Sequence, residues 1–397
     1  MLTPRPPSST APTRPLRVLQ LGMSWLPEQP GNGLDRVYHA LYEHLPDVGV
    51  EVRGLIAGSN DVGPATGNVI TAFAPDTAPL YRRLHAVRRG MRHVLQADPV
   101  DLVASHFALY TAPVLDLIGD RPLVVHFHGP WAAESAVEGA SAIFVYAKRM
   151  MERMVYRRGT RFIVLSEAFR DILVDTYRVP AKNVQIVPGG VDVSRFTTSV
   201  GRTHARHQLG WPTDRPLLLS VRRLARRMGL ETLIEAVDRV RRTVPNVLLL
   251  IAGKGPLQPE LQSLIEVRDL TGNVRLLGYV PEADLPLAYR AADATVVPTH
   301  SLEGFGLITV ESLAAGTPVF VTPRGGLPEV VRDLSPSLVF DGTSPSALAD
   351  RLGAALQNDL PLPSATACRA YAVSHYSWAA VAQQTRAVYE DVLTSCS

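Results

Sequence analysis

Short apolar runs rich in β-branched residues alternate along this chain with stretches whose hydrophobic residues recur at helical spacing. The runs that we expect to form strands are Leu16–Leu21, Val52–Ile56, Leu102–Ser105, Leu123–Phe127 and Phe162–Leu165, followed by Leu217–Val221, Val247–Ala252, Val274–Leu277, Ala294–Val297 and Val319–Val321. Strands that alternate with helices are typical of parallel sheets covered by helices on both faces. The pattern therefore predicts an α/β chain with two doubly wound, Rossmann-like domains that face each other across a cleft.

The composition of the chain indicates where these domains begin and end. Residues 1–15 are rich in proline, serine and threonine, so we expect a disordered tail, followed by a first domain over residues 16–198. Glycines, prolines and polar residues between Val187 and Pro216 are typical of a linker, which we place at residues 199–215. The second domain is expected over residues 216–375, and residues 376–397 have the spacing of a final helix.

Length, cysteine content and charge restrict the class of protein. The 397 residues exceed the size at which one hydrophobic core keeps growing, which also favours two domains. Cys368 and Cys396 have no metal-ligand spacing and indicate a reducing, cytoplasmic location. No apolar run reaches the roughly 18 residues of a membrane span, and the first residues lack the apolar core of a signal peptide. With a net charge of only +3 and no zinc-finger spacing, we expect no nucleic-acid partner.

The stretch from Pro298 to Glu329 carries the clearest chemical signal. It follows an apolar run, passes through Glu303-Gly304-Phe305-Gly306, and has helical spacing from about Leu307 to Ala315. A loop that enters a helix N-terminus is a candidate site for phosphate, because the first backbone N–H groups have no partner within the helix. Glu303 and Glu311 stand on either side of that point, and two such acceptors suit the hydroxyl-rich groups of a sugar nucleotide.

This block resembles a known family. The pattern E-G-F-G-L-x-x-x-E followed by A-A-G-T-P-V is similar to the donor-site signature of the retaining family 4 glycosyltransferases, which have the GT-B fold. The resemblance implies that Glu303 contacts the donor sugar, that the backbone of Phe305, Gly306 and Leu307 meets the sugar and diphosphate, and that Glu311 holds the ribose. Taken singly, Glu303 is better explained as a loop acid and Glu311 as a solvated helix residue, and only the whole block at this spacing favours the functional interpretation.

Two segments of the first domain are candidates for the other side of the site. Gly33 precedes a helical pattern in a long glycine loop, but a dinucleotide-binding G-x-G-x-x-G would need a third glycine where Arg36 stands. The resemblance implies instead that Gly33 approaches the donor diphosphate. His128 follows a strand and is itself followed by glycine, which the resemblance places beside the anomeric carbon. His126 is expected to be structural, and His106 is a weaker candidate.

A basic segment follows the strand Leu217–Val221. It resembles the family's G-R-L-x-x-x-K-G motif, whose arginine and lysine bind the donor diphosphate, so that Arg223 matches the arginine. Arg222 stands in place of the glycine and Met228 in place of the lysine. Arg227 is the nearest candidate to replace the missing lysine, and Arg226 and Lys254 are rivals for the same role. Two further residues, Tyr279 and Val280, lie where relatives of the family cradle the nucleotide base.

We therefore expect a glycosyltransferase that moves a hexosyl unit from a UDP- or GDP-linked sugar to a hydroxyl of a glycan, lipid or small molecule. His128 and Glu303 are its expected catalytic residues, with no cofactor and no metal. The resemblance also implies that the first domain binds the acceptor, the second binds the donor, and the final helix crosses back to the first. A nucleotide-sugar 2-epimerase and a non-catalytic sugar-nucleotide binder are the alternatives. The basic pattern Tyr81–Val94 fits either peripheral membrane contact or a solvated helix over a buried stripe, and the oligomeric state is open.

Overall fold

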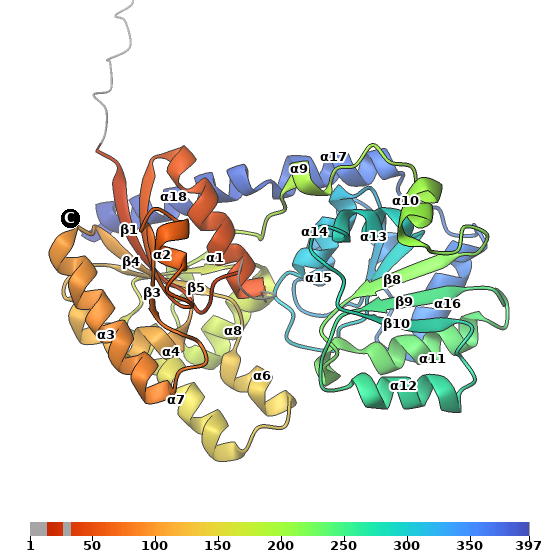
Figure 1. Cartoon of the computed structure of the whole chain (residues 1–397), viewed down its shortest axis with the longest axis horizontal. Coiled ribbons are helices and arrows are strands. Elements are labelled where there is room, and N and C mark those ends of the chain that lie inside the picture. Colours follow the sequence, from red (N-terminus) through yellow and green to blue (C-terminus); the bar gives the residue numbers. More distant parts are fainter. Residues whose placement is uncertain (1–13, 27–32, 397) are drawn as a thin grey trace, which may run out of the picture.

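The structure is a computed structural model that describes residues 14–26 and 33–396, and it contains two parallel sheets side by side (Figure 1). The N-terminal sheet has seven strands in the order β3-β2-β1-β4-β5-β6-β7. These strands are β1 (Leu16–Leu21), β2 (Val50–Ala57), β3 (Ile70–Ala74), β4 (Leu102–Ser105), β5 (Leu123–Phe127), β6 (Arg161–Val164) and β7 (Val184–Ile186). Neighbouring side chains alternate between two cores, so that Val18 belongs to one and Leu19 to the other. Both faces of this sheet are therefore covered.

The C-terminal sheet has five strands in the order β10-β9-β8-β11-β12. They are β8 (Leu217–Val221), β9 (Leu248–Ala252), β10 (Val274–Gly278), β11 (Ala294–Val297) and β12 (Val319–Val321). In both sheets the chain order reverses beside the first strand of the unit, between β1 and β4 and between β8 and β11. Ligands of such sheets bind where the order reverses, outside the carboxyl ends of the strands.

Helices connect the strands and cover the sheets. Those of the N-terminal unit are α1 (Gly33–His44), α2 (Val62–Ala65), α3 (Leu80–Ala97), α4 (Ala108–Thr111), α5 (Leu115–Ile118), α6 (Trp131–Val137), α7 (Ala142–Arg158) and α8 (Glu167–Tyr177). Those of the C-terminal unit are α9 (Val193–Phe196), α10 (Arg202–Leu209), α11 (Leu230–Val240), α12 (Gln258–Val267), α13 (Leu285–Ala291), α14 (Leu307–Ala314), α15 (Leu327–Val331), α16 (Pro345–Leu356) and α17 (Ala365–Tyr376). Within the described ranges, no helix is long and apolar enough to cross a bilayer.

The last helix, α18 (Trp378–Cys396), returns to the N-terminal unit. Figure 1 shows α17 and α18 running along one side of both units. Trp378 and Tyr389 of α18 are buried in the same core cluster as Val18 and Leu41. This packing ties the two units together far from the chain segment that first connects them.

The strands agree closely with the sequence pattern, with two omissions and one difference in the linker. The edge strands β3 and β7 were not predicted, because β3 buries only Ile70 fully and β7 has three residues with none fully buried. The stretch between Val187 and Pro216 contains α9 and α10, of which α10 lies within the expected linker at residues 199–215 and packs against α13. The basic helix α3 turns Ala86, Val87, Met91 and Val94 into the core, as expected for a solvated helix over a buried stripe. The expected tail lies almost wholly outside the described residues, which begin at residue 14.

Candidate active site

The loop after β11 leads into α14 at the carboxyl edge of the C-terminal sheet. Gly306 precedes the helix with a φ of 75°, a left-handed conformation that favours glycine. Phe305 is buried and packs edge-on against Tyr376, so the side chain belongs to the core and only the backbone is available to a ligand. In the first turn, the Thr309 hydroxyl is buried and has no hydrogen-bond partner among the described residues. The start of α14 thus combines free polar groups with a helix N-terminus.

Glu303 is bound by an arginine that the sequence did not identify as functional. The Arg222 Nη2 atom lies 2.5 Å from Glu303 Oε2 and 2.7 Å from both Met228 Sδ and Thr299 Oγ1. The side chains of Arg222 and Glu303 are only 7% and 16% exposed. The replacement of the family glycine by Arg222 was visible in the sequence, but only the fold shows that its guanidinium lies against Met228. A cation therefore stands beside the sulfur of the residue that replaced the family lysine.

Glu311 is buried, so the interpretation of this residue as a solvated helix acid is wrong. Its side chain is 7% exposed; Glu311 Oε2 accepts a hydrogen bond of 2.8 Å from the Tyr289 hydroxyl, and Oε1 lies 3.6 Å from Arg36 Nη1. Burial raises the pKa of Glu311, and the charge of Arg36 offsets part of that rise. Because Arg36 comes from α1, this carboxylate joins the two domains.

A second acid continues this contact between the domains. Glu282 is ion-paired with Arg36, and its other oxygen accepts a 2.6 Å bond from Arg195 Nη2. Burial alone would raise the pKa of Glu282, but the two guanidinium groups outweigh it and lower the pKa. The pair Arg36 and Glu282 was not predicted, since its members are distant in sequence and lie in different domains.

The predicted diphosphate and base residues gather at the carboxyl ends of β8, β9 and β10. Arg223 and Lys254 are exposed, and Lys254 Nζ lies 5.7 Å from the ring centroid of Tyr279, which is also exposed. Val280 is half-buried beside it. Arg227 is more enclosed, because its Nη1 donates a 3.1 Å bond to the Leu302 carbonyl. The fold therefore brings the predicted cationic residues to one edge of the sheet.

Three histidines stack at the carboxyl edge of the N-terminal sheet. The rings of His106 and His126 are 4.2 Å apart and nearly parallel, and His128 Nε2 lies 3.0 Å from His106 Nδ1. His126 Nε2 is 2.8 Å from the Tyr389 hydroxyl of α18. Burial lowers the pKa of His128 to about 3 and lowers the pKa values of His106 and His126 well below the ordinary range. All three imidazoles are therefore neutral at pH 7.

Two nitrogens of this stack have no partner among the residues that the structure describes. They are His128 Nδ1 and His106 Nε2, both buried. Buried polar atoms in folded proteins are normally hydrogen-bonded, so unpaired ones at a strand edge are candidates for ligand contact. His106 and His128 directly follow β4 and β5, which are neighbours in the sheet. The contact between the two histidines could therefore have been predicted if the sequence had shown that these strands pair.

Glu134 lies between the loop after β5, which carries His128, and the basic segment after β8, which carries Arg227. A Cβ added to Gly129, next to His128, would lie 2.6 Å from Glu134 Oε1, and Glu134 Oε2 is 3.7 Å from Arg227 Nη2. Burial raises the pKa of Glu134, Arg227 lowers it in part, and the negative charge of Glu303 raises it further. No pattern marks Glu134, which lies in a helix with no recognisable motif.

The remaining predicted residues, Gly33 and Leu307, begin the helices α1 and α14. Gly33 is the exposed first residue of α1, while the rest of its glycine loop lies outside the described residues. Leu307 is half-buried and packs against core residues of both domains. A Cβ added to Gly304 would overlap the ring of Phe169 in α8. The loop between β11 and α14 is therefore in close contact with α8 across the domain boundary.

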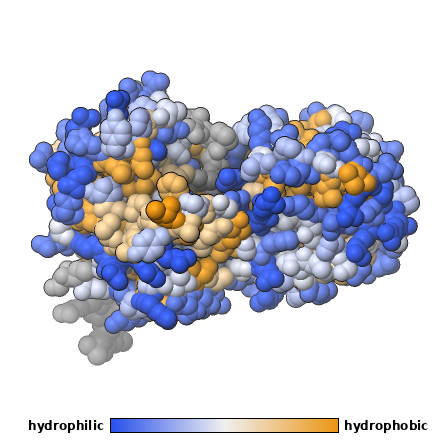
Figure 2. All heavy atoms as spheres, turned by 90° about the horizontal axis from the view of Figure 1, so that it is seen from below, coloured by the Kyte–Doolittle hydropathy of each residue, from blue (hydrophilic) through white to orange (hydrophobic). Residues whose placement is uncertain are grey.

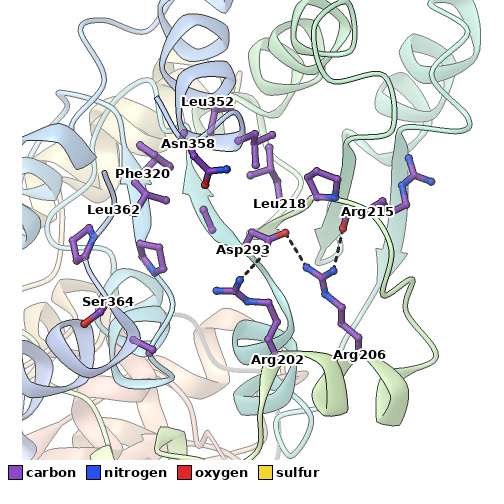
Figure 3. Close-up of a pocket in the computed structure, with 18 of the residues that line it drawn as sticks. Arg202, Arg206, Arg215, Leu218, Asp293, Phe320, Leu352, Asn358, Leu362 and Ser364 are labelled. Carbon is purple, nitrogen blue, oxygen red and sulfur yellow. Dashed lines mark hydrogen bonds and ion pairs between the residues drawn. The ribbon is translucent and has the colours of Figure 1, made fainter. Parts of the chain in front are cut away.

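A cavity of about 560 Å³ lies elsewhere, at the amino ends of β8, β11 and β12 (Figure 3). Its charged groups are largely paired with one another: Asp293 accepts 2.8 Å bonds from both Arg202 and Arg206, and a 2.7 Å bond from the backbone N–H of Leu217. These contacts fasten α10 to the C-terminal sheet. We interpret this cavity as structural, because the predicted site residues lie at the opposite ends of the strands.

Two family models match the chain, one on each domain. Residues 31–195 match the model described as Glycosyltransferase Family 4. Residues 201–374 match the model described as Glycosyl transferases group 1. The second match contains the loop after β11 and the basic segment after β8.

Curated relatives match over different lengths. A D-inositol 3-phosphate glycosyltransferase from Kineococcus radiotolerans is 31% identical over 363 residues, which cover 86% of this chain and 81% of that protein. Proteins of the same name from Corynebacterium kroppenstedtii and Corynebacterium jeikeium are 30% and 34% identical over 62% of this chain. The chain spans only 56% and 61% of the length of these two relatives.

Solved structures share the architecture at lower identity. Sucrose-phosphate synthase from Thermosynechococcus elongatus matches with a TM-score of 0.79 at 20% identity, over 96% of this chain and 100% of that one. Anabaena HepE in complex with UDP and glucose matches with a TM-score of 0.77 at 19% identity, over 95% of this chain and 100% of that one. These likenesses and the two parallel sheets confirm the predicted arrangement of two Rossmann-like domains.

Proposed function

The chain belongs to the family 4 glycosyltransferases of the GT-B fold, and on that premise we propose that it transfers a hexosyl unit from a nucleoside diphosphate sugar to an acceptor hydroxyl, with retention of configuration. UDP is the first nucleotide to test, because HepE is solved with UDP and glucose. A cyclitol phosphate is the first soluble acceptor to test, because the curated relatives are named for D-inositol 3-phosphate.

The observation that carries this proposal is the pair of enclosed carboxylates around the start of α14. Glu303 precedes the helix and is held by Arg222, while Glu311 lies in the second turn and accepts from Tyr289. The N-terminus of α14 and the unpaired Thr309 hydroxyl lie between them in the chain. A nucleoside diphosphate sugar carries the hydroxyl groups of the sugar on one side of its diphosphate and those of the ribose on the other. This order matches a carboxylate, a helix N-terminus and a second carboxylate along the chain.

Charge on the diphosphate would be neutralised by the protein itself. Arg223, Arg227 and Lys254 stand at the ends of β8 and β9, and helix N-termini add partial positive charge. Tyr279 and Val280 would lie against the nucleotide base. We therefore propose that no metal is needed, and we expect that EDTA leaves activity unchanged.

We propose that the reaction is a front-side displacement. The acceptor oxygen forms a bond to the anomeric carbon as the bond from that carbon to the diphosphate oxygen breaks, and the acceptor proton passes to the leaving diphosphate oxygen. Neutral His128 would support the cationic sugar through its free Nδ1. Glu303, fixed by Arg222, would orient the sugar hydroxyls, and Gly33 would lie at the diphosphate.

The experiment that tests this proposal combines donor binding with product analysis. We expect a UDP-, GDP- or ADP-sugar to raise the melting temperature, because a ligand that binds only the folded state stabilises it. NMR of the product should show a glycoside that keeps the donor's anomeric configuration. A free epimerised sugar would assign the chain to the 2-epimerases, and binding without turnover for any acceptor would leave a sugar-nucleotide binder.

The cationic residues can be ranked in the same assay. Arg223→Ala and Arg227→Ala are each expected to lower kcat/KM at least tenfold, about 1.4 kcal/mol of transition-state stabilisation. Unchanged activity in Arg227→Ala together with loss in Lys254→Ala would make Lys254 the second phosphate partner. Loss of activity with EDTA and recovery with magnesium would refute the metal-free mechanism.

A further inference from the structure

Helix α7 exposes a row of large apolar side chains to solvent. Ile143, Phe144 and Tyr146 are 74%, 66% and 64% exposed, and Met150 and Met154 continue the row along the helix. Ile143, Met150 and Met154 lie within about 40° of one another around a helix of 3.6 residues per turn, with Tyr146 about 60° to one side of Ile143 and Phe144 about 100° to the other. We call these five residues the α7 stripe. Figure 2 shows apolar residues gathered on the underside of the N-terminal domain, where Figure 1 places α6 and α7.

The opposite side of α7 is fixed in the core, so the helix cannot turn to bury the α7 stripe. Val155 and Tyr156 are buried in the N-terminal core. Glu152 is fully buried and accepts a 2.7 Å bond from the Tyr177 hydroxyl. Monomeric proteins rarely expose a contiguous apolar patch without a partner for it. The α7 stripe is therefore a surface that something else covers.

A row of positive charge runs along one side of the stripe. Arg149, Arg153 and Arg157 follow one another at intervals of four residues and are exposed. Among the described residues, none of these arginines has a carboxylate within 4 Å. The only acid on α7 itself is Glu152, which points into the core. The surface thus offers apolar groups and unpaired positive charge side by side.

This combination identifies the occupant by its chemistry. A second copy of the chain would bring two arginine rows together, which is unfavourable at short distance. An anionic bilayer offers acyl chains to the apolar row and negative headgroups to the arginines, as for other interfacial helices. The basic helix α3 exposes large apolar side chains only at its start, at Leu80 and Tyr81, because Val87 and Met91 face the core.

We propose that the α7 stripe and its arginine row dock the protein onto an anionic lipid surface. The docking itself does not depend on the proposed reaction. If that reaction is correct, docking would place the acceptor side of the site near the bilayer, since α6 begins three residues after His128 and leads directly into α7.

The test is cosedimentation of the full chain with vesicles of phosphatidylcholine alone or mixed with phosphatidylglycerol. The parent protein is expected to bind the anionic vesicles at least about tenfold more tightly and to be released by salt. Ile143→Gln with Phe144→Gln should lose about tenfold or more of that binding. Val267→Gln is the matched control, because Val267 is an apolar residue that is 83% exposed on α12, away from the stripe.

Either of two kinds of result, in the vesicle assay or in the oligomeric state, would overturn the proposal. One is equal binding to neutral and anionic vesicles, or unchanged binding by the double variant. The other is a dimer of the parent protein that the double variant converts to monomer, which would assign the stripe to a second copy. The melting-temperature shift with a sugar nucleotide should be the same in parent and variant, so a failure of docking is distinguishable from a failure of the proposed function.

Discussion

Replacing Arg222 with methionine tests the centre of the candidate site. The change removes the cation that Glu303 faces at 2.5 Å, and with it the hydrogen bond to Thr299. Methionine keeps much of the side-chain volume, so the loss is chiefly one of charge and hydrogen bonding. Glu303 would remain as an enclosed carboxylate without its partner.

The magnitude follows from how little water reaches this pair. Removing one partner of a fully buried ion pair costs about 3–5 kcal/mol, because the other charge is left unpaired. The Glu303 side chain retains 16% exposure, so we expect a smaller loss of about 2–3 kcal/mol in the free energy of unfolding. A loss of about 2 kcal/mol in the orientation of Glu303 would lower kcat by roughly 30-fold.

A second substitution makes this result specific to charge. Met228 Sδ lies 2.7 Å from Arg222 Nη2, so a lysine at position 228 would bring its ammonium group to the same region. We expect the double variant Arg222→Met with Met228→Lys to have a kcat at least about tenfold higher than that of Arg222→Met alone. Met228→Lys alone should not raise kcat above that of the parent, because it places two cations together. Denaturant unfolding and steady-state kinetics measure both effects. The reasoning is refuted if Arg222→Met matches the parent within twofold, or if the lysine gives no recovery.

Three further predictions concern the residues around this centre. Glu311→Ala should weaken binding of the bare nucleoside diphosphate by about 1–3 kcal/mol in calorimetry, whereas Glu303→Ala should spare that binding and lower turnover; equal losses would contradict this division. Burial lowers the pKa of His128 from 6.5 to about 3, so its contribution to stability is complete above pH 6.5 and is lost as the pH falls toward 3, by about 1.4 kcal/mol per pH unit. The melting temperature of His128→Asn should therefore depend less steeply on pH between pH 7 and 5 than that of the parent. An unchanged slope would show that His128 is not buried in solution. Gly304→Ala should lower the melting temperature by displacing Phe169, and Phe169→Ala should relieve that effect; a Gly304→Ala protein as stable as the parent would mean that the two domains do not meet there.

The fold was largely predictable because its signals are local. Central strands such as β4 and β8 bury nearly every residue, so their apolar runs are continuous and end at recognisable loops. The edge strand β7 has no such run, since it is three residues long with one face open. Local pattern cannot identify a strand whose formation depends on its neighbour in the sheet.

The site was predictable to the extent that it lies within one stretch of chain. Glu303, Gly306 and Glu311 occupy a single loop and helix, so their spacing alone places them together. Arg222 appeared only as a departure from the family motif, because its contact with Glu303 depends on two strands lying side by side. Arg36 had no signal at all, since its partners belong to the other domain.

The charged groups of the site already pair with one another across the domain boundary. Arg36 binds Glu282 and Glu311, and Arg227 lies beside Glu134. In the proposed enzyme a donor would use the same groups, with its ribose hydroxyls at Glu311 and its diphosphate at Arg227. Binding would then exchange one set of pairs for another: the diphosphate would replace Glu134 beside Arg227, and a ribose hydroxyl would replace Arg36 beside Glu311. The first exchange would release Glu134 of the N-terminal domain, whereas Arg36 would lose Glu311 but keep its ion pair with Glu282. In the proposed enzyme, donor binding and the relative position of the domains are therefore coupled through these residues.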